Sequence, residues 1–291
     1  MSTFIQILLR SLETGSVYAL AALGIILIYR TSNITNFSQG VVGMFNTYVV
    51  THIFMNYNVP LAIAILGGIV SAIVVGFLID FFVIRHTKKV SPLAKQIITL
   101  GLIMVFTGIT PILFGVDPLN LPRLIESGNV TILGANLSYN GLFNIVFGIG
   151  VMFALFYFLQ NTKWGLAVRT TASNEYVARL MGVPTKKVTL GAWAVAGALG
   201  VIAGTMIAPT TTVTLNLMDV VQVSALIACV LGGFSTFYGP VVGAYIIGIS
   251  RNLLIFYVDS TWGGQILYLL ILLFLVVKPN GLFGKKVIKK V

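Results

Sequence analysis

Few side chains in this sequence could do chemistry, and Arg251 is the clearest candidate among them. It stands beside Asn252 in the middle of a segment that is otherwise apolar. A guanidinium group in such a segment needs a polar partner or a water-filled cavity, because it keeps its charge. Two interpretations of Arg251 follow: it pairs with backbone carbonyls or a partner subunit, or it lines a transport path.

A second polar cluster occupies residues 33–40, which read Asn-Ile-Thr-Asn-Phe-Ser-Gln-Gly and lie at the start of an apolar run. Polar groups at membrane depth are tolerated where they face a cavity or a neighbouring helix. The same side chains could instead cap a helix at the membrane interface. From the residues alone, both interpretations stay open.

Several kinds of chemistry are excluded by missing motifs. The sequence has no G-x-x-x-x-G-K-[ST] loop, so the chain does not hydrolyse ATP alone. His52 and His86 are far apart, and no H-E-x-x-H, G-x-S-x-G or close carboxylate pair occurs in an apolar run, so no catalytic or metal-binding residue is predicted. Cys229 is the single cysteine, which excludes a disulfide within the chain. The apolar runs carry almost no charge, which argues against a proton or sodium relay built on buried acids, and the TVGYG filter of potassium channels is absent.

The elements that position these residues are membrane-spanning helices. Of 291 residues, 57% are hydrophobic and 9% are charged, whereas soluble domains carry about 25% charged residues. The apolar runs are long and do not alternate, which favours helices over a β-barrel. We predict an all-α polytopic membrane protein forming a single domain over residues 1–291, with about eight or nine transmembrane helices. The nine predicted spans are residues 12–29, 36–55, 60–84, 92–115, 141–160, 188–208, 218–237, 241–258 and 262–277.

The basic residues predict an orientation for these spans. The formal charge of +11 is scattered over segments that flank the apolar runs, which indicates topology rather than nucleic-acid binding. In the nine-span arrangement 15 of the 18 Lys and Arg residues fall on one face, which predicts an outside N-terminus and a cytoplasmic C-terminus. The 15 are Arg30, Arg85, Lys88, Lys89, Lys95, Lys163, Arg169, Arg179, Lys186, Lys187, Lys278, Lys285, Lys286, Lys289 and Lys290. The opposite loops carry Asp117, Arg123, Glu126, Asp219 and Asp259.

Two loops are long enough to have structure of their own. Turn residues interleaved with apolar ones predict a small ordered cap over residues 116–140, for which a short hairpin is one form. Residues 161–187 are predicted to hold a helix of about ten residues, capped by Thr171 or Ser173 and closed by Gly182 in the left-handed conformation. Two pairs, Gly200 with Gly204 and Gly239 with Gly243, have the GxxxG spacing that lets helices approach closely.

Four groups of residues resemble, in their order and spacing, motifs of the Liv-type permeases of branched-chain amino acid ABC importers. They are residues 15–24 with Tyr29 and 36–40; residues 165–169 and 178–183; residues 231–233 with 239–244; and the ending 278–284. The resemblance runs along most of the chain. Two positions depart from it: Gln39 stands where a histidine is usual, and Arg251 stands about where an acidic residue is frequent.

The resemblance implies a permease subunit of an ATP-driven importer in the cytoplasmic membrane of a prokaryote, with no enzymatic activity and no cofactor of its own. Its implied substrates are branched-chain or other hydrophobic amino acids. Its implied partners are a second permease subunit that is a different chain, two ATP-binding subunits on the cytoplasmic side and an extracytoplasmic substrate-binding protein, with no nucleic acid. Two alternatives stay open: transport of urea or short amides, and a free-standing channel or facilitator.

The resemblance also assigns residues to two sites. The residues expected near the substrate path are Asn36, Phe37, Gln39, Gly40, Arg251 and Asn252. A subunit without a nucleotide site needs a contact for a separate ATPase, and the short helix on the basic face is predicted to make it. The residues expected in this coupling contact are Ser173, Glu175, Ala178, Arg179, Met181 and Gly182.

Overall fold

The computed structural model describes residues 2–87, 90–125, 128–132 and 134–284, and this part of the chain holds eleven α-helices and one hairpin. The helices are α1 (Ser2–Ser32), α2 (Gln39–Tyr57), α3 (Leu61–Leu78), α4 (Pro92–Phe114), α5 (Tyr139–Asn161), α6 (Lys163–Ser173), α7 (Glu175–Leu180), α8 (Thr185–Ile207), α9 (Asp219–Gly232), α10 (Tyr238–Tyr257) and α11 (Gly263–Val277). Among the charged residues used for orientation, Lys88, Lys89, Glu126, Lys285, Lys286, Lys289 and Lys290 lie outside the described residues.

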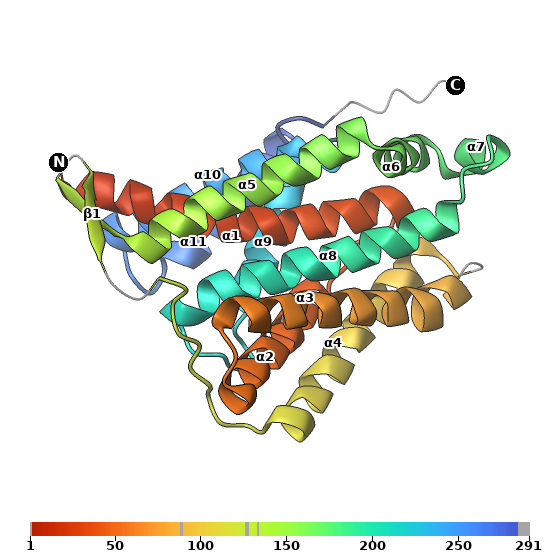
Figure 1. Ribbon diagram of the computed structural model, residues 1–291. Helices are drawn as coiled ribbons and strands as arrows, with labels where there is room; N and C mark the ends of the chain where they lie inside the picture. The colour runs from red at the N-terminus through yellow and green to blue at the C-terminus, as the bar shows by residue number, and fades with distance from the viewer. Residues whose placement is uncertain (1, 88–89, 126–127, 133, 285–291) are drawn as a thin grey trace.

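The bundle has two distinct ends. Strands β1 (Asn129–Ile132) and β2 (Ala135–Ser138) pair antiparallel, with Asn129 opposite Ser138, and this hairpin lies beside the start of α1 at one end. Helices α6 and α7 lie at the other end (Figure 1). We call these the hairpin end and the α7 end. The hairpin confirms the prediction of a small ordered cap over residues 116–140.

Each of the nine predicted spans corresponds to a helix, α1 to α5 or α8 to α11. Among the described residues, six helical stretches are long and apolar enough to cross a membrane, so the chain is a polytopic all-α membrane protein. These stretches are Thr3–Ser32, Leu61–Thr87, Leu93–Phe114, Tyr139–Asn161, Thr185–Thr210 and Tyr238–Tyr257. Helices α9 and α11 are shorter, with 14 and 15 residues, and α2 carries buried polar side chains along much of its length.

Two predicted boundaries are wrong. Helix α1 begins at Ser2 rather than at residue 12, because polar residues such as Gln6 and Arg10 interrupt the apolar residues of its first three turns. Helix α9 ends at Gly232 rather than at residue 237, because Gly233 adopts a positive φ of 91° and starts a turn.

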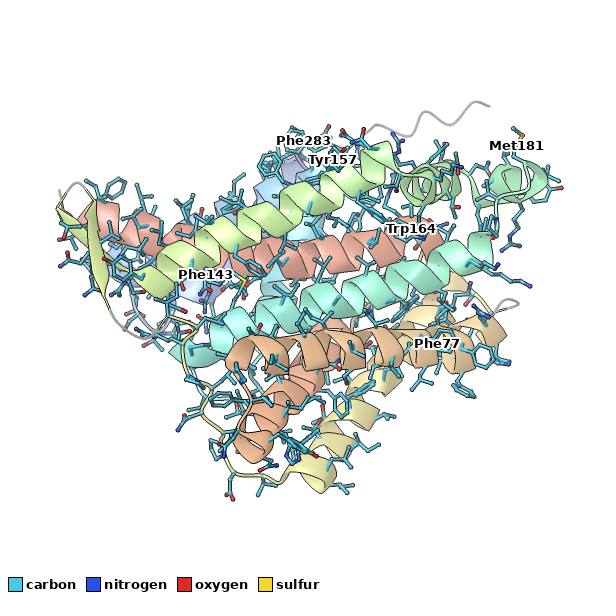
Figure 2. The ribbon with its side chains drawn as sticks, in the orientation of Figure 1. Phe77, Phe143, Tyr157, Trp164, Met181 and Phe283 are labelled. Atoms are coloured by element: carbon cyan, nitrogen blue, oxygen red, sulfur yellow. The ribbon has the colours of Figure 1, made fainter. Side chains whose placement is uncertain are left out.

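Helix α1 is the centre of the fold. Every residue from 15 to 28 is buried, and the helix contacts α5, α8, α9 and α10. The outer helices α3, α4, α5 and α11 instead expose large apolar side chains, including Met104, Ile112, Phe153 and Val276. Phe77 and Tyr157 project outward from the surface in this way (Figure 2). Apolar exposure on this scale fits lipid or a partner subunit rather than water.

Glycines allow the inner helices to approach closely, as the two GxxxG pairs predict. An added Cβ at Gly243 would lie 2.5 Å from the carbonyl oxygen of Ala228 in α9. Across the α2–α8 contact, a Cβ at Gly43 would lie 2.9 Å from the carbonyl oxygen of Gly200. Neither contact leaves room for a side chain, which confirms close helix packing at both pairs.

The connection between α5 and α8 contains two short helices, so the prediction of one helix capped by Thr171 or Ser173 is wrong. Thr171 is buried within α6 and Ser173 ends that helix, whereas Asn174 caps α7 by accepting a hydrogen bond from the Val177 amide at 3.1 Å. The extended backbone of Asn174, with φ of −161°, separates the two helices. Gly182 has a φ of 80°, which confirms its predicted left-handed conformation.

Candidate functional site

A large cavity with both polar and apolar walls opens at the hairpin end. Its volume is about 1300 Å³, and its walls come from α1, the hairpin, α10 and the segment 207–220 between α8 and α9. Its charged lining residues are Arg10, Glu13, Arg123 and Arg251, and four threonines between residues 210 and 214 contribute hydroxyl groups. These three arginines are the basic residues that do not belong to the predicted cytoplasmic clusters. We call this space the hairpin-end cavity.

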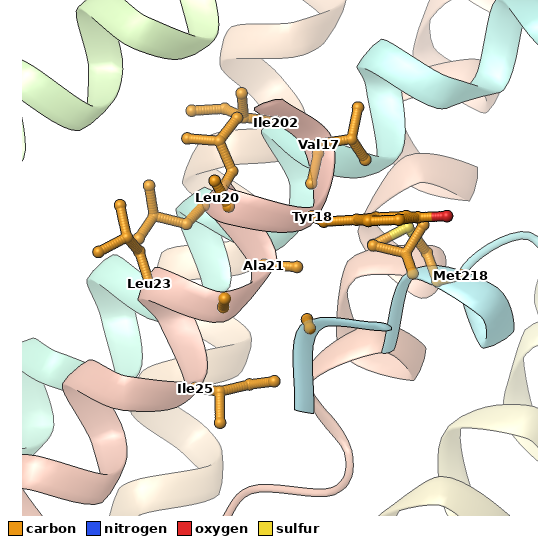
Figure 3. Packing of buried hydrophobic residues seen from close by; sticks show 14 of the residues in the cluster. Val17, Tyr18, Leu20, Ala21, Leu23, Ile25, Ile202 and Met218 are labelled. Carbon is orange, nitrogen blue, oxygen red and sulfur yellow. The ribbon is translucent and has the colours of Figure 1, made fainter. Parts of the chain in front are cut away.

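Arg251 and Asn252 lie together in the wall of this cavity. The Arg251 Nη1 group donates to the Tyr18 hydroxyl at 3.3 Å, while its buried Nε has no hydrogen-bond partner in the described structure. The Asn252 amide donates to Ser11 at 3.2 Å and to Thr14 at 3.4 Å, which ties α10 to α1. Tyr18 projects from α1 on the side opposite Leu20 and Leu23, and its hydroxyl group is at the far end of the side chain (Figure 3).

The other predicted path residues lie elsewhere, where α2 and α9 begin. Asn36, Gln39 and Gly40 are buried, and Phe37 is half-buried. The Gln39 amide donates to the carbonyl oxygen of Ala196, half-way along α8, at 2.6 Å. Helix α2 therefore begins inside the bundle rather than at one of its ends. None of these four residues lines the hairpin-end cavity.

Gln222, in the first turn of α9, completes this contact. Its Oε1 accepts from the Gly40 amide at 2.5 Å, and its amide donates to the Asn36 carbonyl oxygen at 3.4 Å. The Asn36 amide in turn donates to Gln39 at 3.3 Å. We call Asn36, Gln39, Gly40 and Gln222 the α2–α9 junction. It satisfies backbone groups at the start of α2 and a carbonyl oxygen of α8 with side-chain amides.

The predicted coupling residues lie on and around α7. Ala178 faces α8 and is 3% exposed, whereas Ser173, Arg179, Met181 and Gly182 are exposed and Glu175 is half-buried. Arg179 pairs with Glu175, and its Nε donates to the Thr185 hydroxyl at 3.0 Å, which fastens α7 to the first residue of α8. Met181 stands at the tip of the structure (Figure 2).

The chain matches a family model described as "Branched-chain amino acid transport system / permease component" over residues 7–276. It belongs to this family. The permease is 28% identical to the probable branched-chain amino acid transport permease protein LivH of Methanocaldococcus jannaschii, covering 94% of this chain and 91% of the relative. It is 25% identical to the high-affinity branched-chain amino acid transport system permease protein LivH of Escherichia coli K12, over 99% and 98% of the two chains.

A solved structure supports the fold of the permease. PsaBC from Streptococcus pneumoniae in complex with Fab aligns with a TM-score of 0.52 at 13% identity, covering 92% of this chain and 89% of that one. Membership of the family, rather than this likeness, makes the permease a multi-pass membrane protein and a transport component of an ABC system, not an enzyme. Membership of this family implies ATPase and binding-protein partners.

Sequence reasoning missed some residues of the permease that the structure brings into these sites. Arg10, Glu13 and Tyr18 line the hairpin-end cavity, and the exposed side chains of Tyr176 and Leu180 flank Met181 on α7. A signal for the first three existed, because residues 10, 13, 14, 17 and 18 recur at helical spacing and share one face of α1. For metals, the part of the chain that the structure describes contains no group of three or more His, Cys, Asp or Glu side chains suited to an ion.

Proposed function

We propose that this permease translocates branched-chain or other hydrophobic amino acids, with the hairpin end outside the cell and the α7 end in the cytoplasm. In this orientation the N-terminus is outside and the C-terminus inside. The described basic residues Arg30, Arg85, Lys163, Arg169 and Lys187 belong to the predicted cytoplasmic set, and Lys163 and Arg169 are in α6 at the α7 end. Helices α2, α9 and α11 join the six long stretches in the nine-span arrangement.

One observation carries the coupling part of this proposal: the exposed α7 is joined by α8 to the cavity at the opposite end. Arg179 fastens α7 to Thr185, where α8 begins, and Met206 and Ile207, where α8 ends, line the hairpin-end cavity. A rigid helix of 23 residues therefore connects the two sites. A push on α7 by an ATPase would move a wall of the cavity directly.

The partners follow from the same arrangement. Two ATP-binding subunits contact the α7 ends of two permease subunits, of which the second is a different chain, as the Liv-type resemblance implies. An extracytoplasmic binding protein delivers substrate to the hairpin end. Tight capture then belongs to the binding protein, and the permease holds its substrate weakly.

The test is Met181→Asp in the intact complex purified from native membranes. Met181 is 78% exposed and makes no hydrogen bond with its side chain, so the substitution leaves the fold intact. We expect at least a tenfold loss of leucine uptake and of co-purified ATPase, because a buried charge disrupts an apolar contact. Val116→Asp is the matched control, since Val116 is 76% exposed and follows α4 in the loop that leads to the hairpin.

The control variant should keep uptake and ATPase association near the wild-type values. Unchanged uptake in Met181→Asp would reject α7 as the coupling contact. Leucine flux through vesicles containing this chain alone, without ATP, would instead support a free-standing channel. Uptake of urea with no uptake of leucine would support the short-amide alternative.

A further inference from the structure

We propose that an apolar groove over α8 binds an anionic phospholipid, with an acyl chain in the groove and the phosphate at its α7 end, beside Lys187 and Lys163. The groove has a volume of about 440 Å³, and the residues that line it come from α3, α5 and α8 and are all apolar. We call this space the α8 groove. The site goes beyond the proposed function, and only its assignment to the cytoplasmic leaflet rests on the orientation proposed there.

Helix α8 forms the floor of the groove, and α3 and α5 form its sides. Ala194 and Ala198 lie on the floor and are half-buried. Their small side chains leave a space between Ile73 on α3 and Phe158 on α5. Ile73 and Phe158 are each 42% exposed, so the groove opens outward from the bundle. Because the outside of a membrane-spanning bundle is lipid, an acyl chain is the apolar ligand that reaches it.

Trp164 of α6 closes the groove at the α7 end. Its ring centroid lies 5.5 Å from that of Phe158, and an added Cβ at Gly191 of α8 would lie 2.9 Å from its Nε1. Trp164 therefore spans from α5 to α8, about one turn of α8 before the floor residue Ala194 (Figure 2). Tryptophan side chains are enriched at the membrane–water interface, where lipid headgroups lie. The ring marks the level at which the acyl chain ends and the headgroup begins.

Lys187 continues the line of the groove to this level. Residues 187, 191, 194 and 198 are spaced by four, three and four positions, so Lys187 lies on the face of α8 that forms the floor. Lys163 begins α6 directly before Trp164. Both lysines are exposed, and each lies within about one turn of the contact between Trp164 and Gly191. Their long flexible side chains can turn towards a phosphate at the end of the groove.

The positive charge at this end has no counterpart among the described residues. Both ion pairs found there involve arginines, so Lys163 and Lys187 have no acidic partner in this part of the chain. Arg169 adds a third cation, since its Nη2 donates to the carbonyl oxygen of Gln160 near the end of α5 at 3.2 Å. Basic clusters between transmembrane helices on the cytoplasmic side bind the headgroups of anionic lipids. A partner helix would need an acidic residue at this level, whereas every anionic phospholipid carries its phosphate there.

The experiment is a lipid titration of the purified permease–ATPase complex in detergent, read by native mass spectrometry, which counts the lipids bound to each complex. The probes are dioleoylphosphatidylglycerol, dioleoylphosphatidylcholine, which has the same chains but no net charge, and glycerol 3-phosphate, which has the phosphate without the chains. For the wild-type complex we expect phosphatidylglycerol to bind about tenfold more tightly than phosphatidylcholine. Glycerol 3-phosphate should not bind at the concentration at which phosphatidylglycerol saturates the site.

Lysine substitutions test the headgroup end of the site. Lys187→Gln and Lys163→Gln should each lower the affinity for phosphatidylglycerol by about fivefold and leave that for phosphatidylcholine unchanged, because each removes one charge near the phosphate. Lys186→Gln is the matched control. Lys186 is also exposed, but it shares a face of α8 with the buried Trp193, seven residues later, which does not line the groove. This variant should keep the affinity for both lipids.

Larger side chains test the acyl-chain end. Ala198→Leu on the floor and Ala154→Leu on the α5 side fill the groove, so each should lower the affinity for both lipids by about fivefold or more. Gly108→Leu is the control, since an added Cβ at Gly108 of α4 meets nothing within 4 Å. The melting temperature without added lipid shows whether each variant is folded, and the two filling variants test the same space from different helices.

Equal affinity of the wild-type complex for the two lipids would overturn the site, because the groove would then hold only bulk lipid. Equal losses in Lys186→Gln and Lys187→Gln would also overturn it, since the charge would then act as a general surface field. Release of the second permease chain by Ala198→Leu, with lipid affinity unchanged, would make the groove a protein interface instead.

The proposed function is tested separately by leucine uptake with the binding protein present. A complex that imports leucine without a preference for phosphatidylglycerol refutes the lipid site alone. A complex that shows the preference without importing leucine refutes the function alone.

Discussion

The hairpin-end cavity and the α2–α9 junction both place polar side chains among apolar helices, yet they use them in opposite ways. At the junction, Gln39 and Gln222 are buried and their hydrogen bonds go to carbonyl and amide groups of the protein. Arg251 lines the cavity, and its buried Nε has no hydrogen-bond partner among the described residues. A polar side chain in a membrane helix stabilises the fold when the protein supplies all its hydrogen-bond partners. It can bind a ligand when some of its donors have no partner in the protein.

The reason for the difference lies in where the helices begin. Helix α2 starts inside the bundle, so the amide group of Gly40 in its first turn would be unsatisfied without the side chain of Gln222. Helices α1 and α10 run past the cavity without interruption, and their backbone groups are already paired within each helix. Their polar side chains are therefore free to face water or substrate.

The largest expected effect is on packing between α2 and α8, next to the junction. Gly43→Ala, one turn after Gln39, places a Cβ 2.9 Å from the Gly200 carbonyl oxygen, and a backbone atom there cannot move aside easily. We expect a loss of about 2–3 kcal/mol of stability, seen as a lower melting temperature of the purified complex. The matched change beside the cavity is Gly264→Ala, whose Cβ would lie 3.7 Å from the Arg251 Nε, an ordinary contact.

Gly264→Ala should leave the melting temperature nearly unchanged. Equal destabilisation by the two substitutions would mean that the two regions are packed alike, and the distinction between them would fail.

A smaller effect is expected from a pair of amide replacements. Gln222→Leu leaves the Gly40 amide and the Asn36 carbonyl without their partner in a dry interior, which costs about 1–2 kcal/mol. Asn252→Leu also removes two hydrogen bonds, to Ser11 and Thr14, but water in the cavity can replace them. Thermal unfolding in detergent should therefore separate the two variants. A greater loss for Asn252→Leu would contradict the assignment of the junction as the structural region.

Much of the fold could be predicted from the sequence because hydrophobic length is a strong signal. All nine predicted spans correspond to helices, and the hairpin over residues 129–138 follows from its turn residues. The start of α1 was missed because polar residues such as Gln6 and Arg10 interrupt the apolar residues before position 12. The split between α6 and α7 was missed because Thr171, Ser173 and Asn174 are all good caps, and only the backbone conformation shows which of them acts.

The sites were harder to predict than the fold, for a physical reason. The sequence shows that Gln39 and Arg251 are polar residues in apolar surroundings, but not which hydrogen bonds they make. The Gln39 amide donates to the carbonyl oxygen of Ala196, which is 157 residues away in the sequence. No local pattern in the sequence indicates that contact. Arg251 faces a cavity whose other wall begins at residue 6. Whether the hydrogen-bonding groups of a polar side chain have partners depends on contacts in three dimensions, which the sequence does not show.

The smallest expected effect separates the rim of the cavity from its interior. Arg123 is exposed to solvent on the connection between α4 and the hairpin, whereas Arg251 is half-buried on α10. Because an exposed charge acts through water and is screened by salt, Arg123→Gln should lower the initial rate of leucine uptake by about twofold or less at physiological ionic strength. The loss should become larger at low ionic strength, where the Debye length increases to about 30 Å at 0.01 M.

Arg251→Gln should lower uptake more than Arg123→Gln, and its effect should be nearly independent of salt, since a direct contact in a partly enclosed cavity is weakly screened. The comparison is therefore between two slopes of uptake against ionic strength. If both variants show the same slope, Arg251 acts on substrate only through the general positive field of the cavity. A flat slope for Arg251→Gln beside a steep one for Arg123→Gln places the direct contact inside the cavity.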